Sequence, residues 1–201
     1  MKIRVLMLAA LVLTACQIPP VGLSTAYVRP AEPIDVVMPP NAPSIRQQFT
    51  PPPSRDRYAE GHYGIDVVGP LDAPILAPAP GRVVASFVEP IYGGQIIMEH
   101  GPDATGRMYR TRYAHLKSRV VRRGDVVARG QRIGGLGRGG ITAGGILHLH
   151  FEVQQQQSSG RFEPLDPHLF WVDGIGRVTC FEPGRSYPDQ PFAITYPAQC
   201  L

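Results

Sequence analysis

From Tyr58 onward the chain consists of short β-branched or alternating runs that are separated by glycine and proline, such as "HYGIDVVG", "GGQIIMEH" and "ILHLHFEV". Runs of this kind are typical of β-strands, and none of them carries a convincing helical period. The 22 glycines and 22 prolines among the 201 residues also favour short strands and turns over long helices. We therefore expect an all-β fold, with one compact domain over residues 56–172.

The N-terminus has the pattern of an export signal. It has a basic start, an apolar run and small residues before Cys16, and the run is too short to span a bilayer. Leu13-Thr14-Ala15-Cys16 resembles a bacterial lipobox, which implies that residues 1–15 are a signal peptide and that Cys16 carries lipid. Gln17, which is not aspartate, resembles the outer-membrane sorting class. We expect a periplasm-facing protein anchored in the bacterial outer membrane by lipid on Cys16; the alternatives are an inner-membrane anchor and an ordinary secretory signal with a chance cysteine.

Two further cysteines, Cys180 and Cys200, lie in the C-terminal extension formed by residues 173–201. With Cys16 lipidated, they form an even pair in an exported and therefore oxidising setting. We predict a disulfide between them. The alternative is two free thiols.

Residues 16–55 are rich in proline and poor in apolar periodicity, with ten prolines that end in Pro51-Pro52-Pro53. This composition is typical of an extended tether between an anchor and a domain. The alternative is a strand-bearing N-terminal extension that packs on the domain.

Charge and glycine spacing argue against two classes of ligand. The formal charge of +4 falls to +2 when Lys2 and Arg4 are removed with the signal, which is too little to predict nucleic-acid binding. Gly135-x-Gly137-x-x-Gly140 satisfies the dinucleotide fingerprint, but that fingerprint requires a following helix, and a strand follows here. We predict no nucleotide site and expect the glycine run to be a loop that lines a cleft.

The run "ILHLHFEV" places polar side chains on one strand face. Because successive residues of a strand point to opposite faces, one face, expected in the core, carries Leu147, Leu149, Phe151 and Val153. The other face carries His148, His150 and Glu152. In "GHYGID", His62 and Asp66 also share a face if the segment is extended. Catalytic zinc takes three nitrogen or oxygen ligands and keeps one position open. His62, Asp66 and one of the two strand histidines suit such a site, although a solvated strand face is the simpler reading of the histidine pair alone.

The remaining histidines differ in their surroundings. His115, in "TRYAHLKS", is expected on an alternating strand with Tyr113 and Thr111 on its face, where it can move protons or stabilise an oxyanion. By itself it would be read as a surface histidine. His100 and His168 are interpreted as structural.

Together these motifs resemble the lysostaphin-type (LytM-domain) zinc metallopeptidases, which cut peptidoglycan cross-links. The resemblance rests on His62-x-x-x-Asp66, on "TRYAHL" and on His148-x-His150, with support from "APAPGRVVAS", and it covers about residues 58–170. It implies one zinc held by His62, Asp66 and His150, with His115 and His148 as the catalytic pair. It also implies a mainly antiparallel β-sheet whose open groove takes the peptide stem. Gly144-Gly145-Ile146-Leu147 departs from the family, which commonly has glycine and proline before its histidine pair, and this affects the groove wall rather than the metal.

We therefore expect a zinc-dependent endopeptidase that hydrolyses the peptide cross-links of peptidoglycan. The alternative is a non-catalytic or autoinhibited cell-wall-binding regulator of separate amidases. Loss of ligands marks the non-catalytic members, and all five positions are present here. The segment from Cys180 to Cys200 is the candidate cover for an autoinhibited form.

Overall fold

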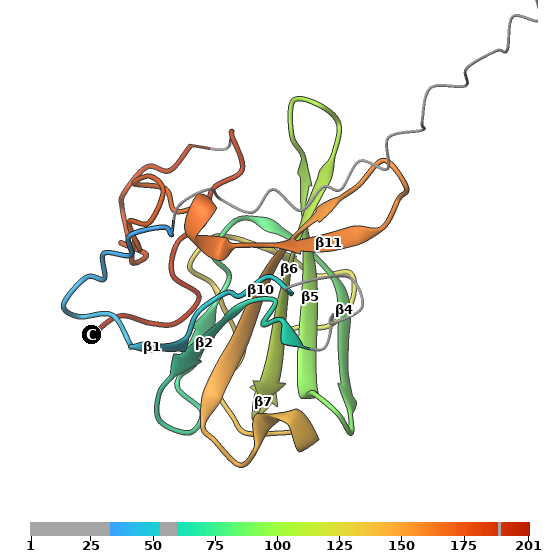
Figure 1. Ribbon diagram of the computed structural model, residues 1–201, viewed down its shortest axis with the longest axis vertical. Coiled ribbons are helices and arrows are strands. Elements are labelled where there is room, and N and C mark those ends of the chain that lie inside the picture. The colour runs from blue at the N-terminus through green and yellow to red at the C-terminus, as the bar shows by residue number, and fades with distance from the viewer. Residues whose placement is uncertain (1–32, 53–59, 189) are drawn as a thin grey trace, which may run out of the picture.

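The computed structural model describes residues 33–52, 60–188 and 190–201. The expected signal peptide, Cys16 and residues 17–32 lie outside the described residues, as do residues 53–59 and 189. The described chain is built around an eight-stranded antiparallel sheet (Figure 1), in which strands are hydrogen-bonded in the order β1-β2-β10-β6-β5-β4-β8, with β11 paired to β10. The expected all-β, mainly antiparallel fold is confirmed.

The strands are short, as the glycine and proline spacing predicts. In the large sheet they are β1 (Ile45–Gln47), β2 (Ile65–Val68), β4 (Gly81–Glu89), β5 (Gly93–Pro102), β6 (Met108–Leu116), β8 (Val126–Val127), β10 (His148–Gln156) and β11 (Phe162–Leu165). A second sheet contains β3 (Pro74–Leu76), β9 (Arg132–Gly135) and β7 (Ser118–Arg119). The described residues also form the 3₁₀ turns η2 (Ile141–Ala143) and η3 (Pro167–Leu169). Among the described residues no helix is long and apolar enough to cross a membrane.

Strand β10 lies between β2 and β6 (Figure 1), and its two faces are divided as its sequence predicts. Leu149, Phe151 and Val153 are fully buried in the core. His148, His150 and Glu152 alternate with them and therefore point to the opposite face. Burying three large side chains on one face strongly specifies the register, because a slip of one residue would move all of them to the other side.

The N-terminal segment corrects the tether prediction for residues 33–52. Strand β1 adds to the edge of the large sheet by pairing with β2, with Gln47 opposite Asp66. Val36, Met38 and Ile45 pack against the core. A solvated tether would leave the alternating apolar side chains of "IDVVM" exposed, whereas here Val36 and Met38 are partly buried. The alternative, a strand-bearing extension that packs on the domain, is therefore the correct description of residues 33–52.

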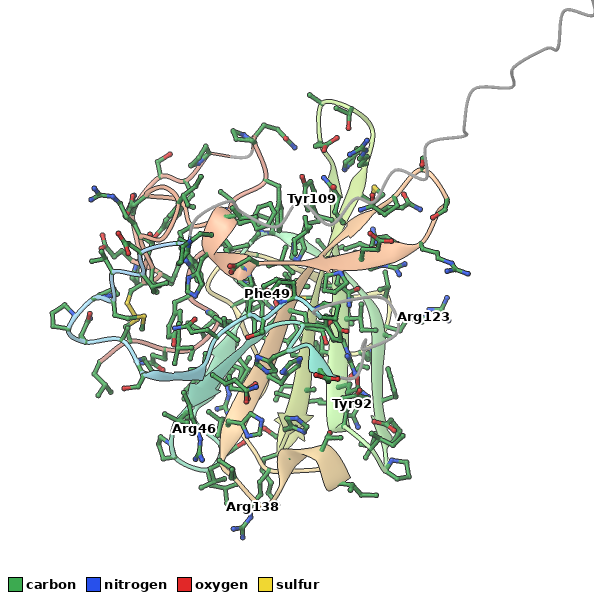
Figure 2. The ribbon with its side chains drawn as sticks, in the orientation of Figure 1. Arg46, Phe49, Tyr92, Tyr109, Arg123 and Arg138 are labelled. Carbon is green, nitrogen blue, oxygen red and sulfur yellow. A yellow bond between two sulfur atoms is a disulfide. The ribbon has the colours of Figure 1, made fainter. Side chains whose placement is uncertain are left out.

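The C-terminal extension packs along the same flank. Val37 donates to Gly176 and accepts from Val178 through its backbone, so the N-terminal segment and the C-terminal extension lie side by side (Figure 1). The predicted disulfide is present between Cys180 and Cys200, with the two Cα atoms 6.1 Å apart. It is the yellow sulfur–sulfur bond of Figure 2.

Candidate metal centre and groove

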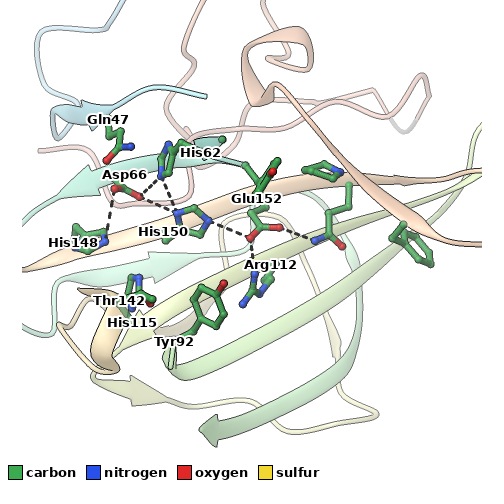
Figure 3. Close-up of a pocket in the computed structure, with 15 residues that line it drawn as sticks. Gln47, His62, Asp66, Tyr92, Arg112, His115, Thr142, His148, His150 and Glu152 are labelled. Carbon is green, nitrogen blue, oxygen red and sulfur yellow. Dashed lines mark hydrogen bonds and ion pairs between the residues drawn. The ribbon is translucent and has the colours of Figure 1, made fainter. Parts of the chain in front are cut away.

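The polar face of β10 forms the floor of an open groove of about 560 Å³. All five candidate site residues line it, namely His62, Asp66, His115, His148 and His150 (Figure 3). Its walls include Gln47, Tyr92, Thr142 and Phe162. No described residue after Pro164 lines the groove, so the described part of the C-terminal extension does not form the cover that an autoinhibited form would need there.

Three candidate ligand atoms converge at one end of the groove. Nδ1 of His150 lies 2.9 Å from Oδ1 of Asp66, and Nε2 of His62 lies 3.1 Å from each of them. Two of these residues meet through strand pairing, because His150 is the register partner of Asp66 across β10 and β2. His62, the third residue, comes from the loop before β2. Among the described residues, these three form the one group that could hold a metal ion.

The geometry and chemistry of these atoms fit a metal ion. Nδ1 of His62 lies 2.8 Å from the carbonyl oxygen of Gln48, to which it donates, so Nε2 of the neutral ring bears a lone pair. That lone pair faces the carboxylate of Asp66, with Nε2 of His62 3.1 Å from Oδ1. Two acceptor atoms at this distance repel each other, and a proton or a cation between them makes the arrangement favourable. Ligand atoms on one tetrahedral zinc ion are roughly 3.3 Å apart, close to the separations seen here. The residues therefore fit zinc.

The structure distinguishes the two histidines of β10. Nδ1 of His150 belongs to the converging group, whereas Nε2 of His148 lies 3.8 Å from the second carboxylate oxygen of Asp66. His148 donates from Nδ1 to the carbonyl of Ile146 at 3.0 Å, which leaves its Nε2 available to the groove. The geometry thus places His150 with the candidate ligands and His148 beside them.

The charges at the centre stabilise one another. Burial by itself raises the pKa of Asp66, but hydrogen bonds with His150 and His62 hold it well below its usual range. Burial by itself lowers the pKa of His150, but hydrogen bonds with Asp66 and Glu152 raise it to about 9. At neutral pH the His150 ring of the metal-free protein is therefore protonated on both nitrogens, with Nδ1 facing Asp66 and Nε2 facing Glu152. A metal ion bound at Nδ1 has to displace the proton there.

Glu152 is a member of the centre that the sequence analysis did not assign. Its Oε1 lies 3.1 Å from Nε2 of His150 and 2.6 Å from a guanidinium nitrogen of Arg112. Burial raises the pKa of Glu152, yet the His150 hydrogen bond and the charge of Arg112 lower it below its usual range. A carboxylate that accepts from the far nitrogen of a ligating histidine orients the ring for metal binding. The alternation of "HLHFEV" places Glu152 on the same strand face as His150, and this is the sequence signal from which its place in the centre could have been predicted.

Arg112 is held in place by its own neighbours. It is the register partner of Glu152 on β6, its Nε donates to Gln95 at 2.9 Å, and its guanidinium lies 4.3 Å from the ring centroid of Tyr92. A planar guanidinium that is both stacked and hydrogen-bonded keeps a fixed orientation. The network thus extends from the candidate ligand His150 to the aromatic wall of the groove.

His115 reaches the groove by a route that alternation does not predict. Its φ of 65° lies in the left-handed region, and the pairing of β5 with β6 is irregular between Gly94 and Ile96. Tyr113 and Thr111 are fully buried, with Tyr113 in the core, so the prediction that they share a face with His115 is wrong. The irregularity near the end of β6 turns His115 toward the groove, at a cost of order 1–3 kcal/mol that the surrounding structure offsets.

The glycine run holds the His115 ring. Nδ1 of His115 donates to the carbonyl oxygen of Gly139 at 2.8 Å, and a Cβ on Gly137 would lie 2.4 Å from the His115 carbonyl oxygen. Glycine is therefore required at position 137 for this close approach. Burial lowers the pKa of His115 to about 4, so the ring is neutral near pH 7. Its centroid lies 4.6 Å from that of His148.

The two histidines interpreted as structural lie outside the groove lining. Nδ1 of His100 donates to the Pro80 carbonyl, and its Nε2 accepts from the Thr111 hydroxyl at 2.7 Å. The backbone N–H of His168 is capped by the Asp166 carboxylate at 2.9 Å.

Comparison with known proteins places this geometry in a family. Residues 60–164, more than half of the chain, match the profile of Peptidase family M23. Peptidoglycan DD-endopeptidase ShyB of Vibrio cholerae is 37% identical over 92 residues, which cover 46% of this chain and 20% of that protein. Murein hydrolase activator NlpD of Escherichia coli is 36% identical over 100 residues, covering 49% of this chain and 24% of that protein. The chain thus spans about a fifth to a quarter of the length of these relatives.

A solved structure agrees with the assignment. The crystal structure of a zinc containing peptidase from Vibrio cholerae superposes with a TM-score of 0.51 at 29% identity, covering 67% of this chain and 39% of that chain. The resemblance to the lysostaphin-type peptidases is confirmed. The chain belongs to peptidase family M23.

Proposed function

We propose that this protein is a zinc-dependent endopeptidase that hydrolyses the peptide cross-links of peptidoglycan. The observation that carries the proposal is the convergence of Nε2 of His62, Oδ1 of Asp66 and Nδ1 of His150 within 3.1 Å of one another at the floor of an open groove. Bound by these three residues, zinc would supply a Lewis acid that polarises the scissile carbonyl and lowers the pKa of a water molecule.

His115 and His148 are the groups that would handle protons in this reaction. Each ring donates from Nδ1 to a backbone carbonyl, of Gly139 and Ile146 respectively, so Nε2 of the neutral ring can accept a proton from water. Once protonated, the same nitrogen can donate to the oxyanion of the substrate. Their contacts with fixed carbonyls hold both rings in place before substrate arrives, which is what preorganised catalysis requires.

The substrate class is supported by the relatives and by the open shape of the site. ShyB is described as a peptidoglycan DD-endopeptidase, and the site here is an open groove of about 560 Å³ whose lining includes Tyr92 and Phe162. Incubation of the purified chain with cross-linked muropeptides, followed by mass spectrometry, tests the proposal. We expect opened cross-links and about one zinc per chain. A zinc-loaded chain that leaves every muropeptide intact would refute it.

The second candidate is a cell-wall-binding regulator of amidases. The similarity to murein hydrolase activator NlpD favours it, whereas the presence and convergence of all five site residues favours the enzyme. Adding the chain to a separate amidase, with and without His150→Ala, distinguishes the two. Stimulation that survives the substitution, without cleavage by the chain itself, supports the regulator.

We further propose that lipid on Cys16 anchors the protein in the outer membrane with its domain facing the periplasm. Since residues 33–52 pack on the domain, only residues 17–32 are left to span the gap, a reach of at most on the order of 50 Å at ~3.1 Å per residue. Palmitate labelling that disappears in Cys16→Ser, together with fractionation, tests the anchor. Soluble, unlabelled protein would contradict it.

A further inference from the structure

The candidate zinc ligand His62 is held by a segment that lies outside the region matched to family M23. Nδ1 of His62 donates to the carbonyl oxygen of Gln48 at 2.8 Å. The backbones of His62 and Thr50 also exchange two hydrogen bonds of 2.8 Å. A carbonyl oxygen only accepts hydrogen bonds, so this contact fixes the proton on Nδ1 and leaves Nε2 for the metal.

Gln48 is itself held by the C-terminal side of the chain. Its side-chain oxygen Oε1 lies 2.7 Å from Nε2 of His168. The indole N–H of Trp171 donates to Nδ1 of His168 at 2.9 Å, and an indole can only donate. His168 therefore accepts at Nδ1 and, as a neutral ring, donates from Nε2 to Gln48. The ring is only 2% exposed and Trp171 only 3%, so the donor end of this chain of hydrogen bonds is rigid.

The two flanking segments are joined along their length. Asn41 and Leu201 exchange hydrogen bonds of 2.9 Å, from the Asn41 side chain and from the Leu201 backbone. The Tyr196 hydroxyl, on a fully buried ring, donates to the Pro43 carbonyl at 2.7 Å. The segment that carries Gln48 is thus attached both to the sheet through β1 and to the C-terminal extension.

We infer that Gln48, His168 and Trp171 are positioning residues for the metal centre, and that they hold His62 in the tautomer and orientation in which Nε2 meets Asp66 and His150. This inference rests on the proposed zinc site. Trp171 orients His168, His168 anchors the Gln48 carboxamide, and the anchored residue aims its backbone carbonyl at Nδ1 of His62. Neither flank lies within residues 60–164, so part of the metal centre of this chain is built by segments outside the family domain.

Zinc affinity of the full chain, measured by competition with a chelating dye, tests the inference. Gln48→Leu removes the acceptor for His168, and we expect zinc binding to weaken about tenfold, the lower end of the range for residues that orient metal ligands. Gln48→Glu keeps an acceptor oxygen, and we expect an affinity within about twofold of the wild type. The visible absorption spectrum of the cobalt-substituted protein should change in Gln48→Leu and not in Gln48→Glu, because it reports ligand geometry.

Two further variants separate positioning from general destabilisation. His168→Phe should weaken zinc binding like Gln48→Leu, and the double variant should be no weaker than either one, because both act on one chain of contacts. Ser44→Ala is the matched control, since Ser44 is an exposed residue of the same segment and its hydroxyl makes no hydrogen bond with the described residues. Thermal unfolding of the metal-free proteins shows whether a variant is folded. If His168→Phe does not fold, the comparison of Gln48→Leu with Gln48→Glu decides whether these residues position the metal centre.

Wild-type zinc affinity and an unchanged cobalt spectrum in folded Gln48→Leu would overturn the inference, and so would an equal loss in Ser44→Ala. Zinc binding that follows the expected pattern in a chain that cleaves no muropeptide would instead support the inference and refute the proposed peptidase. A wild-type chain without affinity for zinc would overturn both.

Discussion

Asp66 and His150, 84 positions apart in the chain, are direct register partners on two antiparallel strands, and Oδ1 of Asp66 lies 2.9 Å from Nδ1 of His150. Sheet pairing thus brings a carboxylate and an imidazole to the spacing of neighbouring ligands on one metal ion. The next polar residue on β10, Glu152, then accepts from the far nitrogen of the same ring. His150 consequently lies between a candidate co-ligand and an orienting carboxylate.

The two histidines of β10 should differ in what their loss removes. His150→Ala should lose both zinc and activity, because Nδ1 of His150 belongs to the converging ligand atoms. His148→Ala should lose activity by a factor of about 10² to 10⁴, the usual contribution of a group that transfers protons, while keeping most of its zinc. Metal analysis and muropeptide cleavage on both variants measure this difference. Equal loss of zinc in the two would contradict the assignment.

Replacing Glu152 should weaken zinc binding without removing a ligand. Glu152→Gln keeps an oxygen that can accept from His150 but removes the charge that faces Arg112, and we expect zinc affinity to fall about tenfold. Glu99→Gln is a matched control, because Glu99 also pairs with an arginine, Arg110, at 2.6 Å and does not line the groove. Chelator competition on the two variants provides the measurement. Similar zinc affinities in both would show that Glu152 has no orienting role.

Zinc binding should depend on pH through His150. Its pKa of about 9 in the metal-free protein means that zinc displaces a proton at neutral pH, so affinity should rise about tenfold per pH unit from ~7 to ~9 and then level off. Titration calorimetry in buffers of different ionisation enthalpy should detect about one proton released at pH 7. Proton-independent binding would refute this assignment.

The same proton affects the stability of the metal-free protein. Because the folded pKa of His150 is raised above the unfolded value of about 6.5, the stabilisation is complete below that pH and is lost as pH rises toward 9. Urea unfolding of the metal-free chain should therefore show a free energy of unfolding that decreases as the pH rises across this range. The His150→Ala variant should not show this decrease.

The disulfide should stabilise the flank without taking part in the reaction. It closes a loop with a sequence separation of 20, for which loop-closure entropy predicts about 3 kcal/mol of unfolding free energy. Cys180→Ser/Cys200→Ser should lower the urea midpoint accordingly, while the zinc-loaded chain keeps its proposed cleavage of muropeptides at low temperature, since neither cysteine lines the groove. A double variant as stable as the wild type would refute the estimate.

Features that depend on neighbouring residues and on known motif patterns could be predicted from the amino-acid sequence. The period of two in "ILHLHFEV" divides core from groove because successive strand residues must face opposite ways, and Leu149 and His150 lie as it predicts. The cysteine count predicted the disulfide, and the spacing of His62, Asp66, His115, His148 and His150 indicated the family. These signals are local or compositional, so they can be recognised in a single amino-acid sequence.

The contacts that join distant segments could not be predicted from the sequence and are seen in the folded chain. The register of β2 against β10 places Asp66 opposite His150, the left-handed φ of His115 turns that residue into the groove, and Gln48 meets both His62 and His168. Proline content predicted a tether for residues 33–52, but composition carries no information about an unpaired sheet edge that accepts one more strand. Pairing, bulges and cross-chain hydrogen bonds depend on which backbone groups remain unsatisfied after the sheet has formed, and that is a property of the folded chain as a whole.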